Sequence, residues 1–380
     1  MIISRTPYRI SFFGGGTDYP AWYTKHGGAV LATTIDKYCY ITCRYLPPFF
    51  EHKCRVVYSK IESCLTIDDI QHPAVRETIR HLNIDRGVEI HHDGDLPARS
   101  GMGSSSAFTV GLLNALYALK GYMPTKHQLA MESIHIEQNM IKETVGSQDQ
   151  ALAAYGGFNH IQFKPNNEIS VRPVIMTAER ARELNSYFML FYTGIIRTAA
   201  TIADSYVNDI ESRKRQLRIM KDLVDESLSL LNNNSDLSGF GELMHEAWQA
   251  KRSLSTSISN SHVDEIYNLA INAGAIGGKI TGAGGGGFML LFVPPELQTK
   301  VKVALKKLIH VPFKFNSEGS QIIYYSHEED YSNQEQERSG QKILPFQELS
   351  NISNKEARLS TKAKTTKSKN AQIPAAASTF

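Results

Sequence analysis

The sequence Asp95-Leu-Pro-Ala-Arg-Ser-Gly-Met-Gly-Ser-Ser-Ser-Ala107 guides the interpretation of the whole chain. A short stretch typical of a strand, residues 87–92, precedes it, and an apolar run of good helix formers, residues 107–119, follows it. We therefore expect a loop rich in glycine and serine that opens a helix. Gly101 and Gly103 permit positive φ and close approach of the backbone. Because the first turn of a helix has free N–H groups and the positive end of the dipole, the loop is predicted to bind phosphate.

One other explanation of this loop stays open on the residues alone: a serine that simply caps an ordinary helix. Two better-known phosphate motifs do not fit. A P-loop requires a lysine directly after its second glycine, and Gly103 is followed by serine. A Rossmann fingerprint would need a third glycine at Ser106 and an acidic residue beyond it.

The composition is that of an ordinary globular protein. With 380 residues, of which 42% are hydrophobic, two domains with packed cores are expected. No apolar run approaches the roughly 18–20 residues of a membrane helix, and the N-terminus does not resemble a signal peptide. The four cysteines include no Cys-x-x-Cys pair, so we predict reduced thiols in a cytoplasmic protein, with a zinc site as the alternative.

The net charge of +3 is unevenly distributed. Residues 351–380 contain six basic residues and one acidic residue, and without them the chain has 35 basic and 37 acidic residues. The globular part is therefore nearly neutral, which argues against nucleic acid as its main partner. The polar segment 333–380, rich in lysine, serine and threonine, is predicted to be mostly disordered.

The order of the expected elements indicates an α+β fold, because strands come first and helices later. We predict an N-terminal domain over residues 1–180, a C-terminal domain over 181–328 and a polar tail over 329–380. Strands are expected at 1–13, 28–46, 54–59, 87–92, 158–163, 169–175, 186–193, 288–293 and 321–325. Helices are expected at 72–82, 107–119, 125–143, 198–232, 239–254, 262–273 and 294–309.

Two further glycine-rich loops flank expected strands. The first, Phe13-Gly-Gly-Gly-Thr-Asp-Tyr-Pro20, cannot be the interior of a strand, and Asp18 in it could bind sugar hydroxyls or form an Asx-turn. The second, Lys279-Ile-Thr-Gly-Ala-Gly-Gly-Gly-Gly287, contains Gly-x-Gly-x-x-Gly but is followed by a strand, so it predicts a glycine hairpin. Such a hairpin could be a loose turn, or its backbone could approach a ligand closely. The entropic cost of four consecutive glycines favours the close approach to a ligand.

Taken together, the three loops resemble the motifs of the GHMP kinases, a family of small-molecule kinases. Pro97 to Ala107 resembles the central ATP motif of that family, Lys279 to Phe288 its C-terminal glycine motif, and Arg9 to Tyr19 the opening of its sugar-kinase branch. The resemblance covers about residues 1–325 and implies a two-domain α+β fold with mixed and antiparallel sheets covered by helices. Ser106 departs from the alanine that the family often has.

The resemblance also implies roles for particular residues. Asp149 matches the catalytic aspartate, and Arg9 matches a basic residue near the transferred phosphoryl group; a structural ion pair is the alternative for Arg9. Ser105 and Glu137 match the Mg²⁺ ligands, although a glutamate at such a position is usually solvated. Sugar binding is implied for Thr17, Asp18, Gly284, Gly285 and Gly286. ATP binding is implied for Pro97, Ser100, Gly101, Met102, Gly103, Ser104, Ser105 and Ser106.

The first motif and residues 145–150 are most similar to the heptose phosphate kinases of the family. This similarity implies an ATP- and Mg²⁺-dependent kinase that phosphorylates the anomeric hydroxyl of D-glycero-D-manno-heptose 7-phosphate. The alternatives are a fucose- or galactose-type kinase, a mevalonate-type kinase, and a catalytically silent sensor of sugar and ATP. The implied partner is a small sugar phosphate, with no membrane, and a homodimer is one option for its oligomeric state. Lys25, Arg197, Lys251 and Arg252 are candidate ligands for the sugar's phosphate.

Overall fold

The computed structural model describes residues 1–380 except 51, 196–198, 233–235, 328–330, 340 and 342–380. Most of the predicted tail therefore lies outside the described residues. One part of it is described: Ser332–Ser339 forms helix α12, where no helix was expected. Among the described residues, no helix combines the length and the apolar character that crossing a membrane requires.

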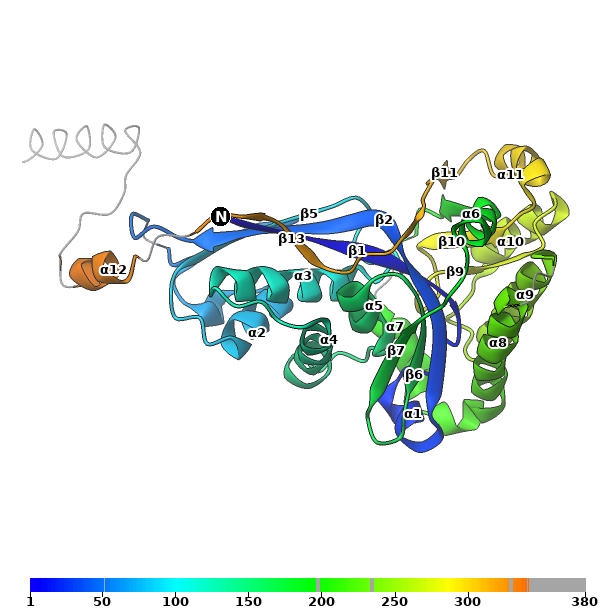
Figure 1. Cartoon of the computed structure of the whole chain (residues 1–380), viewed down its shortest axis with the longest axis horizontal. Coiled ribbons are helices and arrows are strands. Elements are labelled where there is room, and N and C mark those ends of the chain that lie inside the picture. Colours follow the sequence, from blue (N-terminus) through cyan, green and yellow to red (C-terminus); the bar gives the residue numbers. More distant parts are fainter. Residues whose placement is uncertain (51, 196–198, 233–235, 328–330, 340, 342–380) are drawn as a thin grey trace, which may run out of the picture.

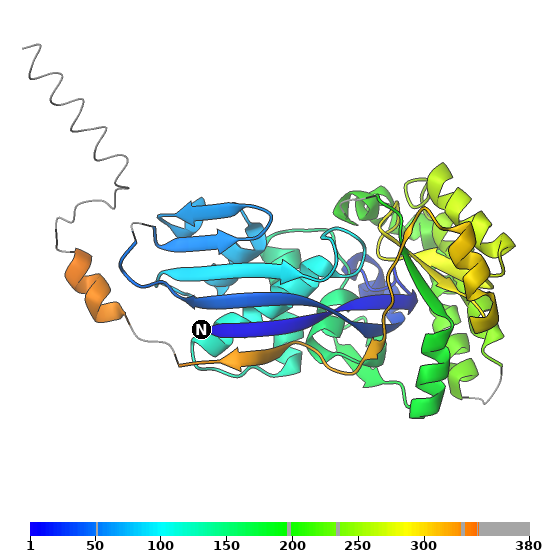
Figure 2. The same ribbon diagram turned by 90° about the horizontal axis from the view of Figure 1, so that it is seen from above.

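The described strands pair into two sheets (Figures 1 and 2). The first is nine-stranded, with the main order β13-β1-β2-β5-β3-β4, and it is mixed because β3 runs parallel to β5 while its other pairs are antiparallel. Its strands are β1 (Ile2–Phe13), β2 (Gly28–Tyr45), β3 (Cys54–Val57), β4 (Ile61–Cys64), β5 (Val88–Gly94), β6 (Phe158–Phe163), β7 (Ile169–Pro173), β12 (Phe315–Asn316) and β13 (Gln321–Tyr325). The second is antiparallel, in the order β11-β8-β10-β9, and comprises β8 (Phe188–Tyr192), β9 (Gly277–Ile280), β10 (Phe288–Phe292) and β11 (Ile309–His310).

Helices cover one face of the first sheet, whereas the view from above shows its strands uncovered (Figures 1 and 2). The covering helices are α2 (Pro73–His81), α3 (Ser104–Leu119), α4 (Lys126–His135) and α5 (Gln148–Tyr155). The second sheet lies with the later helices at the other end of the molecule: α6 (Ala178–Ser186), α8 (Lys214–Asn232), α9 (Ser238–Arg252), α10 (Ser261–Asn272) and α11 (Gln298–Ala304). The remaining α-helices are α1 (Pro20–His26) and α7 (Ala199–Val207).

Helix α3 is the centre of the larger core. From Ser106 to Leu116 its residues are buried, which explains why its sequence is apolar on all sides rather than amphipathic. Gly111 lets the helix approach strand β1, because a Cβ there would lie 2.7 Å from the Thr6 hydroxyl, and the Ser4 hydroxyl donates to the Gly111 carbonyl at 2.8 Å. This close contact holds the start of α3 at a defined place beside β1.

Several element boundaries differ from the predictions. The helix capped by the Thr125 hydroxyl ends as an α-helix at His135 and continues as a π-helical turn, Ile136–Met140, instead of running to residue 143. The region expected to separate two domains contains helix α6, which Thr177 caps. Strands β12 and β13 return to the first sheet, so strand pairing does not follow the predicted second domain up to residue 328. The division near residue 180 itself stays a prediction.

Candidate active site

The loop before α3 contains two glycines with positive φ, Gly101 and Gly103. Gly103, with φ 73°, occupies the N-cap position and offers no side chain to the free N–H groups, so the simple serine cap is wrong. The Ser100 hydroxyl donates to the Pro97 carbonyl at 2.6 Å, and the Arg99 N–H donates to the Ser104 hydroxyl at 3.3 Å. The loop is therefore fixed by its own hydrogen bonds, and the first turn of α3 is left to face a ligand.

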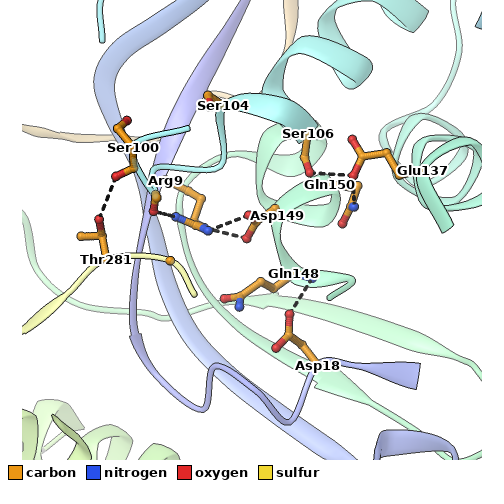
Figure 3. Close-up of polar contacts among 12 residues, drawn as sticks. Arg9, Asp18, Ser100, Ser104, Ser106, Glu137, Gln148, Asp149, Gln150 and Thr281 are labelled. Atoms are coloured by element: carbon orange, nitrogen blue, oxygen red, sulfur yellow. Dashed lines mark hydrogen bonds and ion pairs between the residues drawn. The ribbon is translucent and has the colours of Figure 1, made fainter. Parts of the chain in front are cut away.

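Arg9 and Asp149 form a two-pronged ion pair next to this loop (Figure 3). The Arg9 Nε and Nη2 atoms donate to the two oxygens of Asp149, each at 2.6 Å, and its Nη1 donates to the Gly101 carbonyl at 2.7 Å. The Arg9 side chain is 6% exposed and that of Asp149 is 23% exposed. One arginine thus ties the carboxylate to the loop, and the carboxylate retains a face for a ligand.

Asp18 lies on the other side of Asp149 at the start of α5 (Figure 3). Its Oδ1 accepts the Gly16 N–H at 2.8 Å and its Oδ2 accepts the Gln148 N–H at 3.4 Å. A Cβ at Gly146 would lie 1.9 Å from Oδ2, so this position must be glycine. Burial raises the pKa of Asp18, and the charge of Asp149 raises it further.

Thr17 has a structural role rather than the predicted contact with sugar. Its hydroxyl is fully buried, faces the carbonyls of Gly14 and Ala29 at 2.8 and 3.0 Å, and accepts the Ala29 N–H at 3.1 Å. These bonds hold the first glycine loop against β2. Because the Thr17 hydroxyl already bonds to these backbone groups, its expected contact with the substrate is not supported.

In chain order, Phe13–Pro20 is the first glycine loop, Asp95–Ala107 the second and Lys279–Gly287 the third, and the third packs against the second. A Cβ at Gly101 would lie 2.5 Å from the Thr281 carbonyl oxygen, and one at Gly287 would lie 2.2 Å from the Ser100 carbonyl oxygen. Gly285 donates to the Ile258 carbonyl at 2.8 Å and accepts from the Asn260 amide at 3.2 Å. The hairpin prediction is confirmed by the pairing of β9 with β10. At Gly101, Gly285 and Gly287, however, the close partner is protein backbone or an asparagine amide.

Glu137 is buried and pairs with Ser106 and Gln150 (Figure 3). Its Oε2 accepts the Ser106 hydroxyl at 2.9 Å and the Gln150 amide at 2.5 Å, and its Oε1 has no hydrogen-bond partner in the described structure. Burial raises the pKa of Glu137 to about 7. The alternative of a solvated glutamate is thus wrong. Its serine partner on α3 is Ser106, whereas Ser105, the serine for which the resemblance implied Mg²⁺ binding, is exposed.

The predicted site residues therefore gather around the start of α3. The loop contains Pro97, Ser100, Gly101, Met102 and Gly103, and α3 begins at Ser104. Arg9 and Asp149 adjoin the loop, and Ser106 in the first turn of α3 bonds to Glu137. The Met102 side chain is buried, and its carbonyl accepts the Arg9 N–H at 3.1 Å. Sequence reasoning missed Gln148 and Gln150 as site residues, although their alternation around Asp149 at the start of a helix was a usable signal.

Comparisons with known proteins agree with this geometry. Residues 70–157 match the model of the GHMP kinases N terminal domain, and residues 213–310 match that of the GHMP kinases C terminal domain. The chain belongs to the GHMP kinase family. Its α+β fold with mixed and antiparallel sheets, predicted from the resemblance, is confirmed.

Individual GHMP kinases cover most of this chain. It is 29% identical over 318 residues to the D-glycero-alpha-D-manno-heptose 7-phosphate kinase of Campylobacter jejuni, covering 80% of this chain and 93% of that protein. A putative sugar kinase structure from the same organism is 27% identical, with a TM-score of 0.64, over 85% of this chain and 98% of that one. A D-glycero-D-manno-heptose 1-phosphate kinase from Bacteroides thetaiotaomicron is 24% identical, with a TM-score of 0.70 over 86% and 100% of the chains, and shows the fold alone. This GHMP kinase is thus related to heptose phosphate kinases, and ATP is the expected donor.

Proposed function

We propose that this GHMP kinase transfers the γ-phosphoryl group of ATP to the anomeric hydroxyl of a phosphorylated heptose, with D-glycero-D-manno-heptose 7-phosphate as its acceptor. The observation that carries the proposal is the Arg9–Asp149 pair, which holds a partly exposed carboxylate directly beside the helix-opening loop. The kinship with the Campylobacter jejuni heptose 7-phosphate kinase supports the choice of acceptor.

The arrangement suits phosphoryl transfer because that reaction depends mainly on positioning and on neutralising charge. The N–H groups in the first turn of α3 would hold the nucleotide phosphates. Asp149 would accept a hydrogen bond from the attacking hydroxyl and orient it, while Arg9 fixes the carboxylate and supplies positive charge. Asp18, which the N–H groups of Gly16 and Gln148 hold near the start of α5, would bind a sugar hydroxyl.

The residues at Glu137 fit a Mg²⁺ ion. The unpartnered Oε1 belongs to a buried carboxyl group, and its carboxylate form is the kind of hard ligand that Mg²⁺ binds together with phosphate oxygens and water. Ser106 and Gln150 would orient the carboxylate from Oε2. Mg²⁺ at this place would neutralise charge on the nucleotide phosphates. Ser106, and not Ser105, is given this orienting role because its hydroxyl donates to Glu137.

A panel of acceptors with coupled detection of ADP release tests the proposal. The panel contains heptose 7-phosphate, unphosphorylated heptose, fucose, galactose, mevalonate and homoserine, each with Mg²⁺ and with a chelator. We expect the highest kcat/KM with heptose 7-phosphate, loss of turnover with the chelator, and a product phosphorylated at the anomeric position. ADP release that is independent of every acceptor, with intact ATP binding, would instead indicate the silent sensor.

A further inference from the structure

Lys251, near the C-terminal end of α9, is a buried lysine that the proposed mechanism does not use. It is 5% exposed, and within the described structure its ammonium group makes one hydrogen bond, to the Gly282 carbonyl. An ammonium group has three N–H donors, and leaving a charge buried with so few partners is costly. A buried cation with spare donors is the feature expected of a residue that receives an anion.

The position of Lys251 connects it to the candidate active site. Its partner Gly282 packs on Gly101, since a Cβ at Gly282 would lie 2.6 Å from the Gly101 Cα, and the Gly101 carbonyl accepts from Arg9. Lys251 thus lies where the second and third glycine loops meet. The charges that act on it are those of Arg9, Asp18 and Asp149, together with Lys279 on β9.

The other lysine of this cluster has a different environment. The Lys279 Nζ atom donates to the Phe12 carbonyl at 3.0 Å and is buried, so this bond joins β9 to the end of β1. Lys279 therefore connects the two sheets. Lys251 instead bonds to a carbonyl of the glycine loop that borders the site.

The other three basic residues proposed from the sequence either form ion pairs elsewhere or lie outside the described residues. The Lys25 side chain is 63% exposed and pairs with Glu211 at 3.3 Å. Arg252 pairs with Asp264 at 3.0 Å and lies over the ring of Trp248. Arg197 lies outside the described residues. Of these four candidates, Lys251 is the one that the structure places at the site.

Two unpartnered polar atoms add to the case for a polar ligand beside the first glycine loop. The Gln148 Oε1 atom and the Ser11 hydroxyl are buried and have no hydrogen-bond partner in the described structure. A Cβ at Gly15 would lie 3.6 Å from the Gln148 amide nitrogen and from the Ser11 hydroxyl, so both border the same loop. Gln148 lies between Asp149 and Asp18 (Figure 3). Unsatisfied buried groups of this kind call for a partner.

We propose that Lys251 binds a phosphoryl group in the active site, either the phosphate that the sugar already has or the phosphoryl group being transferred. The inference rests on the proposed function, because both groups belong to that reaction. The chemistry is the same in each case: an ammonium group donates charge-assisted hydrogen bonds to phosphate oxygens. The two sources differ in which substrate loses affinity when the cation is removed.

The test compares Lys251→Met and Lys251→Arg with the wild type and with Arg252→Gln, a matched control on the same helix. Steady-state constants are measured with heptose 7-phosphate and unphosphorylated heptose. Calorimetry measures binding of a non-hydrolysable ATP analogue, ADP and inorganic phosphate. We expect Lys251→Met to weaken one phosphoryl-dependent step about 10- to 100-fold and Lys251→Arg to recover part of this loss. Arg252→Gln should change neither the steady-state constants nor the binding constants.

The pattern of losses identifies the source. A higher KM for heptose 7-phosphate alone assigns Lys251 to the sugar's phosphate. If Lys251→Met loses more affinity for the ATP analogue than for ADP and turns over all acceptors more slowly, Lys251 is assigned to the transferred group. Equal effects on ADP and on the unphosphorylated sugar, or unchanged binding of every phosphate, would overturn the proposal and leave Lys251 a structural residue.

The pH dependence gives a second readout that does not rely on the methionine variant folding. Burial lowers the pKa of Lys251 to about 8; the charge of Arg9 lowers it further, while Asp18 and Asp149 oppose this. Since the ammonium form is required, the affected constant worsens in the wild type as pH rises above about 8, and Lys251→Arg abolishes this dependence. Identical pH profiles for the two proteins would count against the proposal.

The design separates the two proposals. If no sugar is phosphorylated by the wild type, the proposed function fails, but calorimetry with inorganic phosphate and the ATP analogue still tests Lys251. If heptose 7-phosphate is turned over and Lys251→Met behaves like wild type, the function stands and the role of Lys251 fails.

Discussion

Two carboxylates beside helix α3 have contrasting environments. Asp149 is partly exposed and bound on both oxygens by the Arg9 guanidinium. Glu137 is buried, receives hydrogen bonds from Ser106 and Gln150, and has no ion-pair partner within the described residues. The protein supplies the counter-charge for one carboxylate, whereas the other lacks one. This difference supports the proposal that Asp149 orients a substrate and that Glu137 receives a cation.

Asp149→Asn should have the largest effect on this comparison. The amide keeps the shape of the side chain but loses the charge that pairs with Arg9 and accepts the substrate hydroxyl. We expect kcat to fall about 10²- to 10⁴-fold, with the affinity for an ATP analogue nearly unchanged. Coupled ADP release and calorimetry measure the two quantities. Turnover close to wild type would remove Asp149 from the chemistry.

Glu137→Gln should reduce activity by a different route. The amide retains the hydrogen bonds from Ser106 and Gln150 but cannot neutralise a divalent cation. We expect the Mg²⁺ concentration needed for half-maximal turnover to rise by at least the roughly 10- to 100-fold that even outer-shell changes produce. A Mg²⁺ titration at saturating ATP measures it. A fall in kcat with unchanged Mg²⁺ dependence would contradict the metal assignment.

The same variant should change how stability depends on pH. The pKa of Glu137 is raised from 4.5 in the unfolded chain to about 7 by burial. Between these values the native state holds a proton that the unfolded state has released, so stability falls as pH rises through this window. Without nucleotide or metal, Glu137→Gln should therefore be more stable than wild type above pH 7, by about 1–3 kcal/mol, and similar to it near pH 4.5.

Urea unfolding at several pH values measures this difference in the free energy of unfolding. Arg252→Gln, far from Glu137 in the chain and not bonded to it, is the control. A difference between Glu137→Gln and wild type that stays constant from pH 4.5 to 8 would show that the buried carboxyl is not the titrating group.

The smallest expected effect distinguishes two neighbouring serines. Ser106 donates to Glu137, whereas Ser105 is exposed at the start of the helix. Ser106→Ala should raise the Mg²⁺ concentration needed for half-maximal turnover about 10-fold, which corresponds to the loss of one hydrogen bond to a charged group. Ser105→Ala should change this concentration less than about 3-fold. The reverse order would restore the role that the family resemblance implied for Ser105.

Much of this architecture is readable in the sequence because local chemistry determines it. The strand ranges 158–163 and 321–325 were predicted to the residue, and alternation and β-branched residues suffice for strands such as β1 and β2. The start of the helix near residue 125 and the glycine hairpin before β10 were likewise predicted from short-range signals. The resemblance to the GHMP kinase family was recognised from three glycine-rich loops in a fixed order.

Other features depend on contacts between distant segments. The π-helical turn at Ile136–Met140, the return of β13 to β1 and the burial of Glu137 have no local signal. Thr17 looked like a ligand residue until its bonds to Gly14 and Ala29 were known. The glycines of the third loop were explained by a ligand, yet a Cβ at Gly282 or Gly287 would meet backbone atoms of Gly101 or Ser100.

The sequence by itself determined the family and the order of the elements, and it predicted Asp149 and Arg9 as catalytic residues, because these inferences depend on residue types in short motifs. Only the tertiary structure decided that Glu137 pairs with Ser106, that Thr17 is structural and that Lys251 reaches the site from α9. Burial and pairing arise when separate elements pack together, as when Glu137 meets Ser106 from 31 positions away, and the pattern of neighbouring residues does not encode such contacts.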